Sequence, residues 1–260
     1  YKDLIKNIEE FKHKALKPKA IIAVDLFGLP ANYEKLSIIS NEFGLKIISD
    51  AAQSFGGIYN SKKVGTLAEI TCTSFFPAKP LGCYGDGGAL FTNNRVMKEK
   101  IESLRAHGKG KEKYEIIDIG LNSRLDTIQA AILLSKLEVF EWENREKAKI
   151  AKVYNIEINE FYKKPVILKN SSSAWAQYTL KTKKRDKIIS FLKNANIPTM
   201  IYYPVPMHKQ PAYSKYFSNK GQLANSEKLS SQVFSIPVHP YLNELEQEYI
   251  IDHLNKATKV

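Results

Sequence analysis

Hydrophobic residues in the first half of the chain follow two alternating patterns, short continuous apolar runs and stripes at helical spacing. Continuous runs are typical of strands in a parallel sheet that is covered on both faces. The stripes place apolar residues three and four positions apart, which predicts amphipathic helices. This alternation indicates βαβ units, so the sequence predicts an α/β fold. The predicted helices lie at residues 1–17, 32–43 and 96–107, and the predicted strands at 20–25, 45–50, 69–76 and 89–92.

The pattern changes at Asn122, where a long helical stripe begins. Ser123 followed by Asp126 resembles a capping box, so we expect Asn122 or Ser123 to bond the free backbone N–H groups at the helix start. Helical spacing continues to Phe161, which is long for one domain helix. We therefore expect a connecting helix that bends near Trp142.

Beyond Pro165 the pattern predicts a smaller α+β unit. The sequence therefore predicts a large domain at residues 1–144, a connecting helix at 145–164 and a small C-terminal domain at 165–260. Within the small domain, the predicted strands lie at 175–183 and 198–203, and the predicted helices at 186–194, 226–234 and 244–256.

The composition, 43% hydrophobic and 25% charged, is typical of a soluble globular protein. No apolar run approaches the roughly 20 residues that span a bilayer, and the opening residues lack a signal-peptide pattern. We therefore expect a cytoplasmic protein without a membrane partner. Cys72 and Cys83 suit a reducing compartment, and two thiols alone make a poor metal site, so no metal is expected.

The net charge of +12 has two interpretations. A basic surface can bind nucleic acid. Lysines spread along the chain can also form an ordinary solvated exterior, and here the one dense cluster, at residues 109–113, is short. We favour the solvated exterior and expect no nucleic-acid partner. A positive field would equally attract phosphate groups of a small ligand.

Lys79 stands between two prolines, after a predicted strand and before a glycine-rich run. The simplest interpretation is a turn with a solvated lysine. The alternative is a Schiff-base lysine, whose neutral amine attacks a carbonyl group after desolvation has lowered its pKa. Ser74, at the end of the strand, could then hold a phosphate. This stretch alone does not decide between them.

A second stretch favours the catalytic interpretation. The predicted strand at 45–50 ends in Asp50, and ligands of open α/β sheets bind beyond the carboxyl ends of the strands. Asp50 and Ser74 are therefore expected to face one crevice. A carboxylate there can keep a pyridine nitrogen protonated, as pyridoxal phosphate chemistry requires.

Four ordered motifs, spread over essentially the whole chain, resemble the DegT/StrS-type sugar aminotransferases. The resemblance implies a fold-type I aminotransferase, a mostly parallel sheet flanked by helices with a smaller C-terminal α+β domain, and pyridoxal 5'-phosphate as cofactor in the large domain. The motifs are Asp-Ala-Ala-Gln at residues 50–53, the stretch 74–88 around the lysine, Gly-Leu-Asn-Ser-Arg-Leu-Asp at 120–126 with the helix behind it, and the Tyr-Tyr-Pro-Val-Pro stretch at 202–213.

The resemblance assigns a cofactor role to residues of the first two motifs. Lys79 is the expected catalytic residue, which forms the Schiff base and afterwards carries a proton. Asp50 is expected to pair with the pyridinium nitrogen and Gln53 to contact the ring on its hydroxyl side. Ser74 is expected to bind the phosphate, and Ala52 to line the cofactor site.

The other two motifs are expected to contribute across a homodimer interface and to the sugar site. Asn122 resembles a phosphate ligand that the neighbouring subunit supplies, so the active sites are expected to be shared. Arg124 is a candidate to grip a substrate carboxylate, with helix packing or binding of the donor glutamate as alternatives. Tyr202 and Tyr203 are expected to border the sugar, with aromatic core packing as the alternative.

The sequence around Lys79 resembles the branch of the family that aminates a 3-keto carbon. The expected reaction is transfer of an amino group from glutamate to a UDP-linked 2-acetamido-3-keto-uronic acid, for surface polysaccharide such as lipopolysaccharide O-antigen. A 4-keto-6-deoxy or other 3-keto nucleotide-sugar remains an alternative substrate. A non-catalytic DNA-binding regulator is an alternative of another class, and a dehydratase would carry histidine in place of Lys79.

The resemblance also implies an upstream segment on the order of a hundred residues, with a phosphate-binding loop and an aromatic residue that stacks on the cofactor. This sequence contains neither, and it opens on Tyr1 rather than Met. We therefore expect the N-terminal part of the family fold to be missing.

Overall fold

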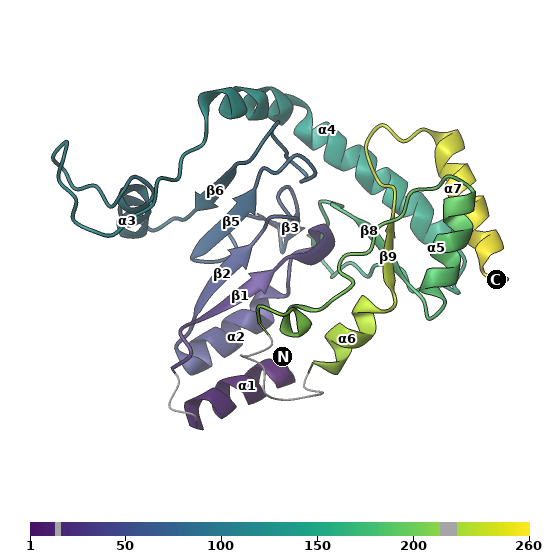
Figure 1. The fold of residues 1–260 in the computed structure, drawn as a ribbon, viewed down its shortest axis with the longest axis horizontal. Helices are drawn as coiled ribbons and strands as arrows, with labels where there is room; N and C mark the ends of the chain where they lie inside the picture. The colour runs from purple at the N-terminus through teal and green to yellow at the C-terminus, as the bar shows by residue number, and fades with distance from the viewer. Residues whose placement is uncertain (14–16, 214–222) are drawn as a thin grey trace. The chain divides into compact units, whose positions relative to one another are not determined.

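The computed structural model describes residues 1–13, 17–213 and 223–260 (Figure 1). The chain divides into two compact units. The first comprises Tyr1–Trp142 and Ile167–Ala176, and the second comprises Glu143–Val166 and Gln177–Val260. The short segment 167–176 thus belongs with the first unit, whereas the sequence pattern grouped it with the C-terminal residues.

A four-stranded sheet forms the centre of the first unit (Figure 1). Its order is β1-β2-β5-β6; the first three strands are parallel, and β6 is antiparallel to β5. The register pairs Val24 with Asp50 and Asp50 with Cys72. The predicted α/β fold with a mostly parallel sheet is confirmed. The strands are β1 (Ala20–Val24), β2 (Lys46–Asp50), β5 (Ile70–Ser74) and β6 (Gly88–Phe91).

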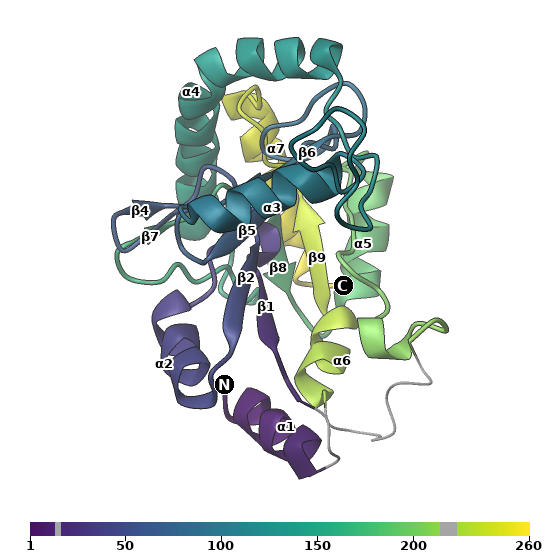
Figure 2. The same ribbon diagram turned by 90° about the vertical axis from the view of Figure 1, so that its left-hand side faces the viewer.

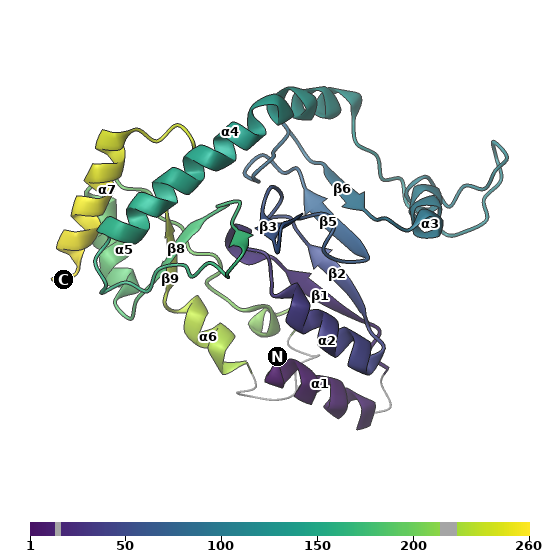
Figure 3. The ribbon, with the colours of Figure 1, turned by 180° about the vertical axis from the view of Figure 1, so that it is seen from behind.

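Two helices pack on one face of this sheet, α1 (Lys2–His13) and α2 (Tyr33–Phe43) (Figure 3). The N-cap of α2 is Asn32, whose side chain accepts from the backbone N–H of Lys35, and its C-cap is Gly44. These signals fix the helix bounds close to those predicted. The shared core consists of Ile8, Ile21, Ala23, Tyr33, Leu36, Ile39, Leu45, Ile47 and Tyr59.

A second, three-stranded sheet was not predicted. It contains β3 (Ile58–Tyr59), β4 (Lys62–Lys63) and β7 (Ser171–Ser172) in the order β4-β3-β7. All three strands are two residues long, and two of them are entirely polar. Such segments are too short to show an alternating pattern, which explains why the sequence did not reveal them.

Helix α3 (Arg95–Arg105) lies beside β5 and β6 and is capped by Asn94 (Figure 2). A loop follows whose two ends are tied together: the N–H of His107 donates to Leu121 O at 2.8 Å and that of Leu121 to Leu104 O at 2.7 Å. Gly108 lies in this neck with φ +72°, and a Cβ there would overlap the carbonyl of Asp118. The neck therefore requires glycine at this position.

Helix α4 (Thr127–Glu157) starts later than predicted. Residues 122–126 are not helical: Asn122 bridges to Ala106, and the N–H of Ser123 donates to Arg105 O at 2.8 Å. The capping box expected at Asn122 and Ser123 was therefore wrong, because these residues pair with the end of α3 instead. The two units divide α4 between Trp142 and Glu143, and the helix ends four residues before Phe161.

The second unit contains a two-stranded antiparallel sheet of β8 (Tyr178–Lys181) and β9 (Val233–Ile236), with helices α5 (Arg185–Asn194), α6 (Ala224–Ser230) and α7 (Glu244–Ala257). A single-turn 3-10 helix spans Met207–Lys209. The predicted helix at 226–234 was wrong in its last residues, because all four residues of β9 are buried in a strand.

The predicted strand at 198–203 was also wrong: only Met200 pairs there, in an isolated bridge with Ser235. Prolines at 198 and 204 lack the N–H that a ladder needs, which limits pairing at both ends of this segment.

Buried tyrosines form hydrogen bonds within the core of the second unit. The hydroxyl of Tyr154 donates to Pro237 O at 2.9 Å, and that of Tyr162 donates to Leu254 O at 2.8 Å.

Candidate active site

Asp50 and Ser74 lie at the carboxyl ends of neighbouring parallel strands. Because Asp50 pairs with Cys72, Ser74 lies two residues further along β5. Side chains at every second position share one face of a sheet, so Asp50, Cys72 and Ser74 lie on the same face. All three are half-buried. Burial raises the pKa of the Cys72 thiol, and the carboxylate of Asp50 raises it further.

The turn after β2 carries the next two predicted residues. The Oδ1 atom of Asp50 accepts from the N–H of Ala52 at 3.1 Å, and the N–H of Ala51 donates to Cys72 O at 2.8 Å. Gln53 is buried, and its Oε1 accepts from the N–H of Phe27 at 2.6 Å. Its side-chain oxygen thus binds the loop after β1. Contact between Gln53 and a cofactor ring stays a prediction.

Ser74 and Lys79 flank the turn that follows β5. Ser74 Oγ accepts from the N–H of Phe76 at 3.2 Å; this contact does not use the hydroxyl proton of Ser74. Lys79 is half-buried, and its N–H donates to Phe76 O at 2.9 Å. The turn returns tightly, since a Cβ on Gly82 would overlap the carbonyl oxygen of Pro77 and lie 2.8 Å from its carbon. Glycine at residue 82 therefore allows the turn to close.

Helix α4 holds the returning arm of this turn, which sequence reasoning missed. Lys136 Nζ donates to Gly82 O at 2.6 Å and lies 4.9 Å from the ring centroid of Tyr84. The N–H of Tyr84 donates to Gln129 Oε1 at 2.8 Å. Cys83 is fully buried, and its Sγ lies 3.0 Å from Phe75 O. The turn that carries Lys79 is therefore fixed from the helix side.

A buried carboxylate at the end of β1, Asp25, was also missed. Its side chain is inaccessible to solvent and accepts three hydrogen bonds, from Ala31 N–H at 2.8 Å, Tyr33 Oη at 2.9 Å and Ser54 Oγ at 2.7 Å. Burial raises the pKa of Asp25, and these donors oppose the rise. Its backbone N–H donates to Asp50 O at 3.0 Å. The strand-end position that revealed Asp50 applies equally to Asp25.

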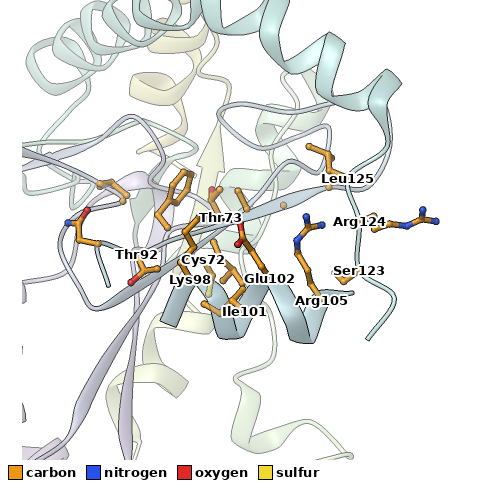
Figure 4. A pocket seen from close by; sticks show the side chains of 18 of the residues that line it. Cys72, Thr73, Thr92, Lys98, Ile101, Glu102, Arg105, Ser123, Arg124 and Leu125 are labelled. Carbon is orange, nitrogen blue, oxygen red and sulfur yellow. Dashed lines mark ion pairs between the residues drawn. The ribbon is translucent and has the colours of Figure 1, made fainter. Parts of the chain in front are cut away.

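Two residues of the third motif, Ser123 and Arg124, line a cavity that Cys72 also lines. This cavity of about 1070 Å³ lies along β5, β6 and α3, and it includes Ser123 and Arg124 in its lining but not Lys79, Asp50 or Ser74 (Figure 4). Asn122 and Arg124 are exposed. Figure 4 shows the Arg124 side chain turned away from β5. Within the first unit, the structure therefore does not bring Arg124 to the strand ends.

Tyr202 and Tyr203 belong to the second unit, where their ring centroids lie 5.5 Å apart. Tyr203 is 52% exposed, so it is not a core residue of that unit, whereas Tyr202 is half-buried. Their contact with a sugar stays a prediction.

The described residues show neither a metal-binding cluster nor a membrane-spanning helix. Among the residues that the structure describes, no three His, Cys, Asp or Glu side chains form a group that could hold a metal ion. In the same residues, no helix combines the length and apolar character needed to cross a bilayer. Both cysteines are free thiols.

Comparison with curated proteins gives close relatives. The chain is 44% identical over 228 residues to the UDP-2-acetamido-2-deoxy-3-oxo-D-glucuronate aminotransferase of Pseudomonas aeruginosa, covering 87% of this chain and 62% of that protein. It is 39% identical over 242 residues to a pleiotropic regulatory protein of Geobacillus stearothermophilus, covering 92% of this chain and 65% of that protein. The chain thus spans less than two thirds of the length of these relatives.

Solved structures show the same fold. A DegT DnrJ EryC1 StrS aminotransferase from Brucella abortus superposes with a TM-score of 0.95 at 44% identity, over 98% of this chain and 69% of that one. NtdA from Bacillus subtilis, with bound cofactor PMP, superposes with a TM-score of 0.85 at 27% identity, over 95% of this chain and 59% of that one. The profile of one family matches residues 4–255, and the chain therefore belongs to the DegT/DnrJ/EryC1/StrS aminotransferase family.

Proposed function

We propose that this chain is part of a pyridoxal-phosphate-dependent aminotransferase that acts on a nucleotide-linked keto sugar. The observation that carries the proposal is the placement of Asp50 and Ser74 on one face at the carboxyl edge of the sheet, with the Lys79 turn directly after β5. The donor set suits the cofactor: it offers an amine for the aldehyde, a carboxylate for the ring nitrogen and a hydroxyl for the phosphate.

Each of these residues has a distinct role in the proposal. When bound, pyridoxal phosphate supplies an electron sink for moving an amino group between carbon atoms. Lys79 Nζ anchors the cofactor covalently and then moves a proton at the reacting carbon. Asp50 holds the proton on the pyridine nitrogen. Ser74 donates its hydroxyl proton to the phosphate, and Ala52 and Gln53 line the ring.

The proposed acceptor is a UDP-linked 2-acetamido-3-keto-uronic acid, and the proposed donor is glutamate. The relative at 44% identity is named for an acceptor of this kind, and other relatives are named for dTDP-linked sugars or for a UDP-linked 3-keto-glucosamine. Arg124 is the proposed ligand of the uronate carboxylate, since a guanidinium can form two parallel hydrogen bonds with it. Tyr202 and Tyr203 are proposed to border the sugar. The proposed setting is surface polysaccharide synthesis in the cytoplasm.

We propose further that two copies form a homodimer with shared sites, in which Asn122 reaches the phosphate in the partner's site. Large apolar side chains are exposed next to Asn122 and on the first turns of α4, as an uncovered interface would require. The most exposed is Ile119, at 100%. The others are Ile116, Ile117, Leu121, Ile128, Leu134 and Leu137.

The proposal is tested by borohydride trapping. Full-length protein loaded with pyridoxal phosphate is reduced with borohydride, and the labelled peptide is identified by mass spectrometry. We expect the label on Lys79, its loss in Lys79→Ala, and retention in Lys149→Ala, which changes an exposed lysine of α4. Glutamate and a panel of UDP- and dTDP-linked keto sugars then identify the acceptor. Absence of cofactor binding, or a label at another lysine, would overturn the proposal.

A regulator is the second candidate function, favoured by one comparison: the relative at 39% identity is named a pleiotropic regulatory protein. The net charge of +12 would suit nucleic acid. A regulator of this kind needs no reactive lysine. DNA binding with a steep salt dependence, together with no trapping at Lys79, would favour it over the aminotransferase.

A further inference from the structure

Asp25 ties together two loops that approach the proposed cofactor site. The first loop follows β1 and is held through the N–H of Ala31; the second follows β2 and is held through the hydroxyl of Ser54. Ser54 directly follows Gln53, whose Oε1 in turn accepts from the N–H of Phe27 in the first loop. The two loops are therefore joined twice, through the carboxylate of Asp25 and through the side chain of Gln53.

The same residue reaches Asp50 through the backbone. The N–H of Asp25 donates to the carbonyl oxygen of Asp50 at 3.0 Å, at the last rung of the β1–β2 ladder. The side chain of Tyr33 extends the network, since its hydroxyl lies 2.9 Å from Asp25 Oδ1 and 2.6 Å from Ser49 Oγ. Ser49 precedes Asp50 on β2. Asp25 is thus bonded to the backbone of Asp50 and the side chain of Ser54, and it is linked to Ser49 through Tyr33.

Core packing alone does not require this arrangement, because an aliphatic side chain would fill the end of β1 without burying a carboxylate. A buried carboxylate with three donors orients the groups that donate to it, because each hydrogen bond has a preferred distance and angle. An aliphatic side chain would only fill the space. The three donors come from the loop after β1, the first turn of α2 and the loop after β2. What they fix is the course of the chain from Asp50 to Ser54.

We propose that Asp25 is a positioning residue of the cofactor site, which holds Asp50 and Gln53 in the orientation that the ring requires. The proposal rests on the proposed function, since it takes Asp50 and Gln53 to be cofactor residues. Because its side chain is inaccessible to solvent, the proposal gives Asp25 no direct contact with the ring. Its effect on the cofactor passes through Ser54 and through the backbone of Asp50.

The test compares Asp25→Ala, Asp25→Asn and Ser54→Ala in full-length protein loaded with pyridoxal phosphate. Two quantities are measured besides turnover: the dissociation constant of the cofactor, and the visible circular dichroism of the bound cofactor, which reports how firmly its ring is oriented. We expect Asp25→Ala to weaken cofactor binding about tenfold and to reduce the circular dichroism. Asp25→Asn, which keeps the shape and can donate to Ser54, should restore most of both. Ser54→Ala should fall between Asp25→Ala and wild type.

Tyr162→Phe is the matched control, since it removes a buried hydrogen bond in the second unit. It should lower the melting temperature without changing either cofactor readout. If wild type binds the cofactor and Asp25→Ala leaves both cofactor readouts unchanged, the positioning role is overturned. If Asp25→Ala does not fold, Ser54→Ala decides: unchanged cofactor readouts in Ser54→Ala overturn the role as well. If wild type itself fails to bind, the proposed function fails instead.

Discussion

Lys136 Nζ lies 2.6 Å from the carbonyl oxygen of Gly82 and donates a hydrogen bond to it, which links α4 to the turn that carries Lys79. Lys136→Met keeps the aliphatic stem and removes the donor. We expect kcat to fall about tenfold, because the turn that carries Lys79 loses a hydrogen bond from a charged group. The melting temperature should change little. Lys149→Met on the same helix is the control, because its amine bonds Glu146 at the surface. Equal kcat values in Lys136→Met and Lys149→Met would contradict the idea that the bond from Lys136 to Gly82 holds the turn of Lys79 in place.

Gly82→Ala should destabilise the first unit. The added methyl group would overlap Pro77 O, so the turn must shift, at a cost of about 3 kcal/mol in the free energy of unfolding. Gly44→Ala is the control: a Cβ there meets open space, and only its left-handed backbone costs about 1 kcal/mol. Urea unfolding measures both. A smaller loss for Gly82→Ala than for Gly44→Ala would show that the turn relaxes freely.

The shared-site proposal predicts complementation between two inactive subunits. Lys79→Ala and Asn122→Ala should each be nearly inactive alone, because each homodimer lacks one essential group in both sites. A mixed dimer regains one site with both groups, so activity should return on mixing. Size-exclusion chromatography with differently tagged subunits checks that mixed dimers form. Inactive mixed dimers would rule out a shared site.

Arg124→Lys should reduce activity on the charged substrate selectively. Lysine keeps the charge but loses the paired hydrogen bonds to a carboxylate, so we expect a loss of about tenfold or more in kcat/KM for the 3-keto uronate. A 3-keto sugar with a neutral C6 should be affected much less. Equal losses on both sugars would assign Arg124 to the donor or to the subunit interface.

Lys147 should make stability depend on pH above neutrality. Burial lowers its pKa to about 8 from 10.5, and Glu143 opposes the shift. Between these values the unfolded chain binds more protons than the folded one, so stability should rise as pH rises from about 8 to about 10. Below pH 8 the cost of the buried charge is fully present.

Lys147→Met should therefore stabilise the protein at pH 7 by about 2 kcal/mol and remove the rise. Urea unfolding at pH 7 and pH 10 measures this. Lys149→Met, at an exposed position, should change neither value. A destabilised Lys147→Met variant at pH 7 would mean that the contacts of the amine outweigh its burial.

The sequence predicted the central sheet well because each of its strands can be recognised from its own residues. The strand β1 is an apolar run, and β2 and β5 are short runs rich in β-branched residues, so Asp50 could be placed at a strand end by counting residues. The placement of Asp50 and Ser74 at one edge followed from the rule that ligands of open α/β sheets bind beyond the carboxyl ends of the strands. The antiparallel direction of β6 did not follow, since a four-residue run carries no information about direction.

The sequence did not predict contacts between distant residues that stabilise the site. Gln129 and Tyr84 are 45 residues apart, and Lys136 and Gly82 are 54 apart. On α4, Gln129 and Lys136 have the pattern of an ordinary polar helix surface. The helix start expected at Asn122 and Ser123 was wrong for a related reason. Their residue types suit a helix cap, but their backbone pairs with the end of α3, and the helix begins only at Thr127.

The neck at Gly108 makes the loop that follows α3 a convenient attachment point for a probe. Its root is fixed by hydrogen bonds between His107, Leu121 and Leu104, whereas the side chain of Tyr114 further along is 84% exposed. A fluorophore on a cysteine introduced at Tyr114 would therefore be attached to an anchored loop, close to Ile116 and Ile117 of the proposed subunit interface. Energy transfer between labels on two copies would report whether the proposed homodimer forms, without altering the strand ends.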